Sequence, residues 1–224
     1  MKTKKLFFYL LAGVLVGCVP SLHPLFTDED VIFEEKLLGI WAGEKDSNET
    51  WEFQRYGDES GKRYKMIYTD KEGKEGGFLA TLGRLNSMLF LDLFPGEAEI
   101  NTNDFYKIHL LGVHTFMKIE QIEPMLQMRV MDADKMKEML ESDPNLIKHE
   151  VLEEQDSKIV LTASTKELQR FMIEHAEDEG LFGGATELKR LRIKDINEPN
   201  AIDANAVEPN QTEPNSIEPN EVWG

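Results

Sequence analysis

Cys18 is the residue of this chain whose chemistry is easiest to place, because it is the only cysteine. Three lysines among the first five residues, an apolar run over residues 6–16 and the small residue Gly17 precede it. A basic start, a short apolar run and a small residue at the cleavage position are typical of a secretory signal peptide. The run is too short for a transmembrane helix, which needs about 20 apolar residues. We therefore expect residues 1–17 to be a signal peptide, cleaved between Gly17 and Cys18.

The sequence Leu15-Val16-Gly17-Cys18 resembles the lipobox of bacterial lipoproteins. This resemblance implies that Cys18 receives a diacylglyceryl group, becomes the first residue after cleavage and is then N-acylated, for example with palmitate. The alternative is an ordinary buried thiol, but an exported chain with one unpaired cysteine is unusual, and lipidation uses the thiol up. Two or three acyl chains make the attachment durable, whereas one binds only marginally. Val19 follows where lipoproteins retained at the inner membrane have Asp, which implies the periplasmic face of the outer membrane.

The charge of the chain limits its partners. The formal net charge is −17, and removal of residues 1–17 takes away three lysines and no acidic residue, which leaves −20. Such a surface repels nucleic acid and anionic lipid headgroups, so we expect no nucleic-acid partner and a membrane contact made by the lipid on Cys18. Without a second cysteine there is no disulfide, and the fold must depend on its apolar core.

Sequence motifs of catalysis are missing. The chain lacks Gly-x-Ser-x-Gly, Ser-x-x-Lys, His-Glu-x-x-His and a phosphate-binding glycine loop. We therefore expect no catalytic residue and no enzyme activity. A pair of neighbouring carboxylates among the 42 acidic residues stays an open alternative, because spacing in the sequence does not reveal it.

Two groups of residues are weighed as metal ligands. Soft thioethers can bind Cu(I), and six methionines lie close in the sequence: Met117, Met125, Met128, Met131, Met136 and Met139. However, Met128 lies on the predicted inward face of a strand and Met136 on the apolar stripe of a helix, where methionine fills a core. His109 and His114 flank Gly112 and could meet across a hairpin, but no third ligand has the spacing of a zinc site. We expect neither a metal nor a cofactor.

The two ends of the mature chain differ from its middle. Pro20, Pro24 and three acidic residues interrupt any regular pattern before residue 31, so residues 18–30 are predicted to be a lipidated cysteine and a tether that spans at most about 40 Å. From Glu198 the chain repeats EPNAI, DANAV, EPNQT, EPNSI and EPNEV. Regular prolines and few large apolar groups predict a disordered acidic tail over residues 195–224, with docking of a partner on the repeats as the alternative. Between them, residues 31–194 are predicted to form one β-rich domain.

Apolar and polar residues alternate with period two over much of this domain, which predicts half-buried antiparallel strands. The pattern is found around residues 50–54, 63–69 and 126–130, with further strands expected at Phe78–Leu85, Met88–Phe94, Phe105–Leu111, Thr115–Ile122, Ile147–Leu152, Lys158–Thr162 and Glu187–Ile193. Short connections rich in Gly, Asn and Pro join them. We therefore expect a mainly β (α+β) fold, in which an antiparallel meander forms a curled sheet or an up-and-down barrel.

Two short helices interrupt the meander. One is predicted over Asp132–Ser142, and the other over Ser164–Ala176, where Ser164 and Glu167 form a capping box. The segment Phe78–Phe94 is apolar on both faces, so a helix or another chain must cover its outer face. Its bulky residue Phe90 is expected to point inward with five others (Trp51, Phe53, Tyr64, Tyr68 and Phe78) and to fill the barrel.

The residues Gly39-Ile40-Trp41 resemble the Gly-x-Trp start of the lipocalins, which follows a short helical turn and opens the first barrel strand. This resemblance implies a lipocalin-like barrel in which Gly39 allows close backbone approach and Trp41 closes the floor; an ordinary buried tryptophan is the alternative. The chain departs from the family because no Thr-Asp-Tyr motif follows, and the arginine expected before the late helix is missing. Arg190 and Arg192 come after that helix.

The mature start, Ser21-Leu22-His23-Pro24-Leu25, resembles a group of bacterial lipoproteins and brings no activity with it. Two functions follow from the sequence. The first is a non-catalytic, lipid-anchored protein of the cell envelope that binds or supports another envelope component. The second is a lipocalin-like carrier that holds a small apolar ligand in the barrel. They differ in whether the barrel is filled or hollow.

Overall fold

The computed structural model describes residues 18–43, 48–57, 61–96, 103, 107, 109–152 and 158–191. The elements among them are η1 (Glu35–Leu37), β1 (Gly39–Ala42), β2 (Thr50–Arg55), β3 (Tyr64–Thr69), β4 (Glu75–Leu85), β5 (Met88–Pro95), β6 (Thr115–Gln121), β7 (Met125–Val130), α2 (Ala133–Ser142), β8 (His149–Leu152), β9 (Lys158–Leu161), α3 (Thr165–His175) and β10 (Thr186–Arg190). None of the helices in these ranges has the length and apolar composition needed to cross a bilayer.

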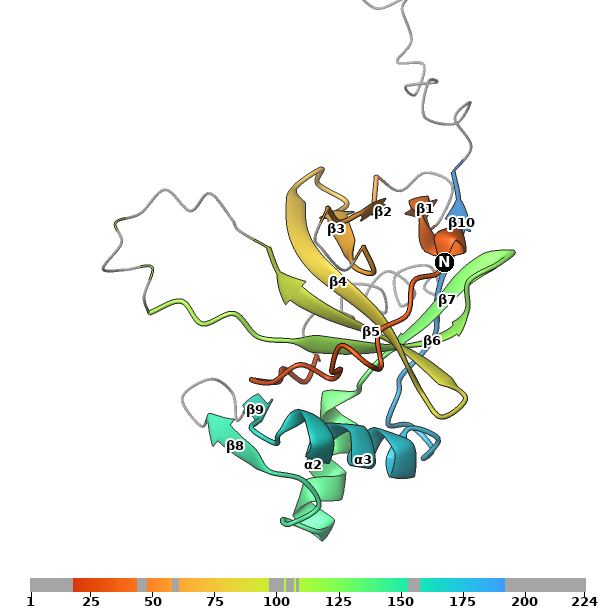
Figure 1. Cartoon of the computed structure of the whole chain (residues 1–224). Helices are drawn as coiled ribbons and strands as arrows, with labels where there is room; N and C mark the ends of the chain where they lie inside the picture. The colour runs from red at the N-terminus through yellow and green to blue at the C-terminus, as the bar shows by residue number, and fades with distance from the viewer. Residues whose placement is uncertain are drawn as a thin grey trace, which may run out of the picture. The chain divides into compact units, whose positions relative to one another are not determined.

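Eight of the strands form a closed antiparallel barrel in the order β1-β10-β7-β6-β5-β4-β3-β2 (Figure 1). Strands β2 to β7 pair with their neighbours in the chain, and β10 closes the barrel between β7 and β1. The predicted mainly β fold with an antiparallel meander is therefore confirmed, and the barrel is realised rather than an open curled sheet. Closure gives each of the eight barrel strands a neighbour on both sides, so the barrel has no edge strand.

Large side chains fill the interior of the barrel. Trp41, Phe53 and Tyr64 are completely or almost completely buried there. The other interior residues are Leu37, Trp51, Met66, Ala80, Leu82, Leu91, Leu93, Met117, Ile119, Leu126, Met128 and Leu188. An eight-stranded barrel has room for its own side chains or for one small ligand, and these side chains are packed together in its interior.

The prediction for Phe90 is wrong. Leu89, Leu91 and Leu93 point into the barrel, so the period of two places Phe90 on the outer face, where it is fully buried under the helices. Both faces of this strand are apolar, and the sequence alone does not say which one faces inward.

The helices and the β8–β9 hairpin are inserted between β7 and β10 and cover the outer wall of the barrel. Phe90 of β5 and Phe116 of β6 belong to the same buried cluster as Met136 of α2 and Leu168 and Phe171 of α3. The expected cover over the apolar outer face therefore comes from this chain's own helices. Both helices are present where they are predicted. Asp132 and Ser164 are their N-caps, and the predicted capping box of Ser164 and Glu167 is present.

The segment predicted as a tether, residues 18–30, is packed into the folded domain, so the predicted boundary at residue 31 is wrong. Val19 and Leu25 are almost completely buried between the barrel wall and the helices. Ser21 exchanges backbone hydrogen bonds with His114. Leu161 of β9 accepts from the backbone N–H of Leu22 and donates to the carbonyl oxygen of Pro20. The prolines prevent a regular element, but the apolar residues between them are buried, and this burial fixes the segment.

One predicted strand is wrong where the structure describes it. Over Phe105–Leu111, Lys107 is helical and residues 109–111 form no strand. The remaining strand predictions are confirmed, with ends shifted by up to three residues, as for β8 and β10. The predicted signal peptide and the predicted acidic tail both lie outside the described residues.

Candidate functional site

The residues predicted to close the barrel floor, Gly39 and Trp41, lie together at one end of the barrel. Trp41 is completely buried, and its indole Nε1–H donates to the carbonyl oxygen of Leu37 in η1 at 2.9 Å. The guanidinium of Arg190 lies over its ring, with Cζ 4.2 Å from the ring centroid. The indole is therefore fixed by a hydrogen bond to η1 and by a cation–π contact with Arg190.

Arg190 is the residue of this end that sequence reasoning did not assign. It is the last residue of β10, and it donates hydrogen bonds to the carbonyl oxygens of Lys36 and Leu38, with Glu123 3.7 Å away. Gly39 has φ +120°, and a Cβ on it would lie 2.7 Å from an Arg190 nitrogen. The positive φ of Gly39 and the close approach of Arg190 both favour glycine at this position. The one feature of the sequence that points to Arg190 is its position at the end of the last strand.

Trp51 is the cross-strand partner of Trp41 in the pairing of β1 with β2, and its indole Nε1–H has no hydrogen-bond partner within the described part of the chain. Its side chain is buried and meets the ring of Tyr68 edge-on at 5.0 Å. Burial, followed by the nearby carboxylates of Glu49 and Asp70, raises the pKa of Tyr68 to about 12. Trp51 is therefore a buried donor without an acceptor among the described residues.

Cys18 lies at the start of the described chain, in a backbone bridge with Asp132, the residue that caps α2. Burial raises the pKa of its thiol, and the charge of Lys158 on β9 opposes this shift. The next residue, Val19, is buried in the domain. A group attached to Cys18 is therefore attached directly to the folded domain. Gly17, the other residue of the predicted cleavage site, lies outside the described residues.

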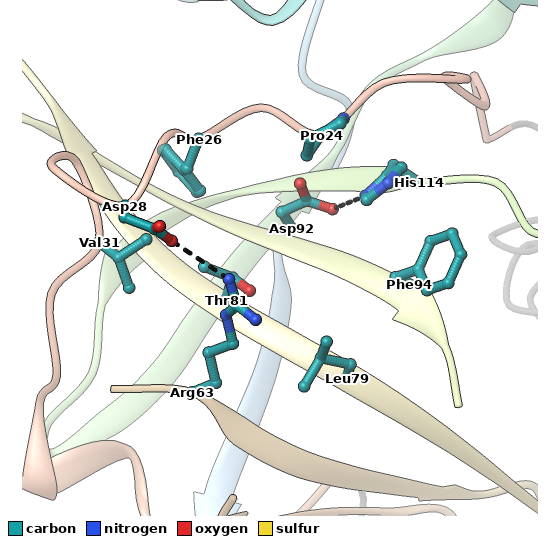
Figure 2. A pocket seen from close by; sticks show the side chains of 10 residues that line it. All are labelled: Pro24, Phe26, Asp28, Val31, Arg63, Leu79, Thr81, Asp92, Phe94 and His114. Atoms are coloured by element: carbon teal, nitrogen blue, oxygen red, sulfur yellow. Dashed lines mark hydrogen bonds and ion pairs between the residues drawn. The ribbon is translucent and has the colours of Figure 1, made fainter. Parts of the chain in front are cut away.

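A second polar site lies on the outer wall of the barrel, and sequence reasoning did not find it. Ten residues enclose a groove of about 250 Å³ between strands β4 and β5 and the segment that precedes η1: Pro24, Phe26, Asp28, Val31, Arg63, Leu79, Thr81, Asp92, Phe94 and His114 (Figure 2). The groove brings together residues from five separate stretches of the chain, which is why no motif in the sequence marks it.

The centre of this groove is the pair Asp92 and His114. Asp92 is only 4% exposed, and its two carboxylate oxygens are both engaged. One accepts the backbone N–H of Leu25 at 2.9 Å, and the other lies 2.8 Å from Nδ1 of His114. A carboxylate on Nδ1 makes that nitrogen the donor and leaves Nε2 for another partner. The ring centroid of Phe94 lies 4.6 Å from that of the imidazole, so Phe94 packs against the His114 ring.

A second charged pair lies at another side of the groove, where Arg63 contacts Asp28 at 3.3 Å (Figure 2). Thr81, the cross-strand partner of Asp92, lies between the two pairs, and apolar side chains line much of the rest of the groove (Figure 2). The groove therefore combines an apolar surface with one rigidly oriented imidazole.

The residues considered as metal ligands are not brought together. Met117 and Met128 lie in the barrel interior, whereas Met131 and Met136 lie under the helices. His114 is paired with Asp92, and the hairpin expected between it and His109 is not formed. In the described ranges no three His, Cys, Asp or Glu side chains gather as metal ligands.

No protein-family model, no curated protein and no solved structure matches the chain.

Proposed function

We propose that this protein is a lipid-anchored, non-catalytic component of a bacterial cell envelope, attached through acyl groups on Cys18. In this proposal it resides at the periplasmic face of the outer membrane and binds or supports another envelope component. The barrel serves as a solid scaffold, and the surface of the domain makes the contacts.

The observation that carries the proposal is the position of Cys18. It is the only cysteine, it follows a signal-peptide pattern, and the next residue, Val19, is buried in the folded domain. Lipid on this residue would hold the domain directly against the bilayer, because the segment after it is packed between β6 and β9. The net charge of −20 expected after cleavage opposes electrostatic binding to anionic lipids, so the acyl chains would supply the attachment.

The filled barrel supports a scaffold rather than a carrier. Trp41, Phe53 and Tyr64 are bulky, inward and fully buried, and the closure by Arg190 leaves the floor occupied by protein. A ligand inside would have to displace these side chains.

The test is a substitution of Cys18 with serine in the producing bacterium. Cys18→Ser should abolish incorporation of labelled palmitate and move the protein from the membrane to the soluble fraction. Leu22→Ser, which changes an exposed apolar residue of the same segment, is the matched control and should keep both properties. Unchanged membrane retention of Cys18→Ser would refute the anchor. Crosslinking in cells, followed by recovery of the complex, would then identify the envelope component.

The second candidate function, a carrier of a small apolar ligand in the barrel, is favoured by one observation. The indole N–H of Trp51 is buried in the interior without an acceptor in the described part of the chain. A ligand with an acceptor atom would satisfy it. Native mass spectrometry of protein extracted from its host decides between the two: a stoichiometric small molecule that Trp51→Phe loses would favour the carrier.

A further inference from the structure

We propose that the groove on the outer wall of the barrel binds a small uncharged aromatic molecule that carries a hydroxyl group, and that this hydroxyl donates to Nε2 of His114. The site lies outside the barrel interior and is independent of lipid on Cys18. It therefore goes beyond the proposed function, and either can fail without the other.

The first reason is the fixed orientation of His114. Its backbone exchanges hydrogen bonds with Ser21, its Nδ1 is paired with the buried Asp92, and its ring lies against Phe94. The side chain is 16% exposed and lines the groove. Its Nε2 makes no hydrogen bond within the described ranges of the chain. A neutral imidazole with Nδ1–H on a carboxylate presents the Nε2 lone pair, which accepts a hydrogen bond from a ligand.

The second reason is the apolar surface beside the imidazole. Phe26 and Val31 come from the segment before η1, and Leu79 and Phe94 come from the outer faces of β4 and β5 (Figure 2). In register, Leu79 pairs with Phe94 and Thr81 with Asp92, so these side chains form two adjacent rows on one face of the sheet. Mostly apolar walls with a few polar groups that set orientation, here His114, Asp92, Thr81 and the Arg63–Asp28 pair, are typical of small-molecule sites.

The volume of the groove and its charged side chains limit the class of ligand that it can bind. A cavity of about 150 Å³ is sufficient for benzene, so a groove of about 250 Å³ has room for one substituted ring. The groove holds two carboxylates, Asp28 and Asp92, and one guanidinium, Arg63, which is already in an ion pair with Asp28. The rest of the chain is strongly acidic. Anionic ligands are therefore disfavoured, and an uncharged donor fits.

The experiment uses 4-methylphenol as the probe and toluene as the matched compound without a hydroxyl. The full chain is purified in detergent, and protein-free micelles provide the baseline for partition of both compounds. Binding is followed by calorimetry and by the ¹⁵N resonances of the histidine side chains. We expect a dissociation constant near the millimolar range for 4-methylphenol, weaker binding of toluene, and a shift of the His114 Nε2 resonance.

His114→Phe keeps a ring in place and removes the acceptor, so it should weaken 4-methylphenol binding by about 3- to 10-fold, the value of one hydrogen bond. It should also remove the difference between the two compounds. His175→Phe is the matched control, because His175 forms the same kind of pair with Asp178 at 2.8 Å outside the groove. Leu79→Trp, which fills the groove without touching the Asp92 pair, is the second variant and should abolish binding even if His114→Phe does not fold.

Three results would overturn the proposal. They are no shift of the His114 resonance at saturating probe, equal binding of 4-methylphenol to the wild-type chain and to folded Leu79→Trp, and an equal loss in His114→Phe and His175→Phe. If Cys18→Ser loses its lipid and its membrane retention while these binding results stand, the groove and the anchor are separate properties.

Discussion

Replacement of Gly39 with alanine tests the closure of the barrel floor. The residue has φ +120°, a conformation that alanine rarely adopts, and its new Cβ would lie 2.7 Å from a guanidinium nitrogen of Arg190. The backbone strain costs about 1–3 kcal/mol. The arginine must also move away, although it lies over Trp41 and bonds two carbonyl oxygens, and one lost charged hydrogen bond costs about 1.5 kcal/mol or more. We expect Gly39→Ala to lower the free energy of unfolding by about 3 kcal/mol.

Two other glycines separate the cost of backbone strain from the cost of the clash with Arg190. Gly73 has φ +80° and open space around its missing Cβ, so Gly73→Ala should carry backbone strain alone, about 1 kcal/mol. Gly184 has open space and no positive φ, so Gly184→Ala should change stability by less than about 0.5 kcal/mol. Urea unfolding, analysed by linear extrapolation, measures all three. In an Arg190→Ala background, Gly39→Ala should cost less than in the wild type, because the clash is gone. Two results would show that the closure does not depend on Arg190. One is that Gly39→Ala lowers the free energy of unfolding no more than Gly73→Ala does, and the other is that it lowers it equally in the wild type and in the Arg190→Ala background.

The two interior tryptophans and the cap of α3 provide the remaining predictions. Trp41→Phe should destabilise more than Trp51→Phe, by about 1 kcal/mol, because the Trp41 indole donates to Leu37 and that of Trp51 donates to nothing in the described chain; chemical denaturation of both variants checks this, and equal losses would contradict it. The side chain of Lys148, followed by the Ser164 cap, lowers the pKa of Glu167 to about 2. The lowered pKa stabilises the fold above the usual value of about 4.5, and this contribution is lost as the pH falls from there to about 2. Thermal melts should therefore show a smaller acid sensitivity for Glu167→Gln over that range than for wild type, and identical pH profiles would refute this assignment.

Much of the barrel could be predicted from local patterns. The alternation around Trp51 and Phe53, the turn signals and the capping box at Ser164 each depend on a few neighbouring residues, and the structure has the expected elements there. The start of the folded domain and the face of a strand that points inward were harder to predict. The sequence does not reveal the face on which Phe90 lies, because its strand is apolar on both faces. It predicts a tether over residues 18–30, because the prolines there give no sign that Val19 and Leu25 are buried.

The candidate site was predicted only in part. Gly39 and Trp41 could be named from a local pattern, but Arg190, which completes the closure, lies about 150 residues later in the chain. The groove could not be predicted at all. Asp92 and His114 are 22 residues apart, and Leu25 lies 67 residues before Asp92.

The sequence by itself determined the strands, the helix caps and the attachment chemistry expected at Cys18, because each of these depends on residues that are neighbours in the chain. Only the tertiary structure decided that the meander closes, that side chains fill its interior and that the segment after Cys18 is packed into the domain. It also decided that a buried carboxylate orients His114 beside an apolar groove. These properties depend on contacts between distant segments, and burial against another element is not encoded in the spacing of residues within one segment.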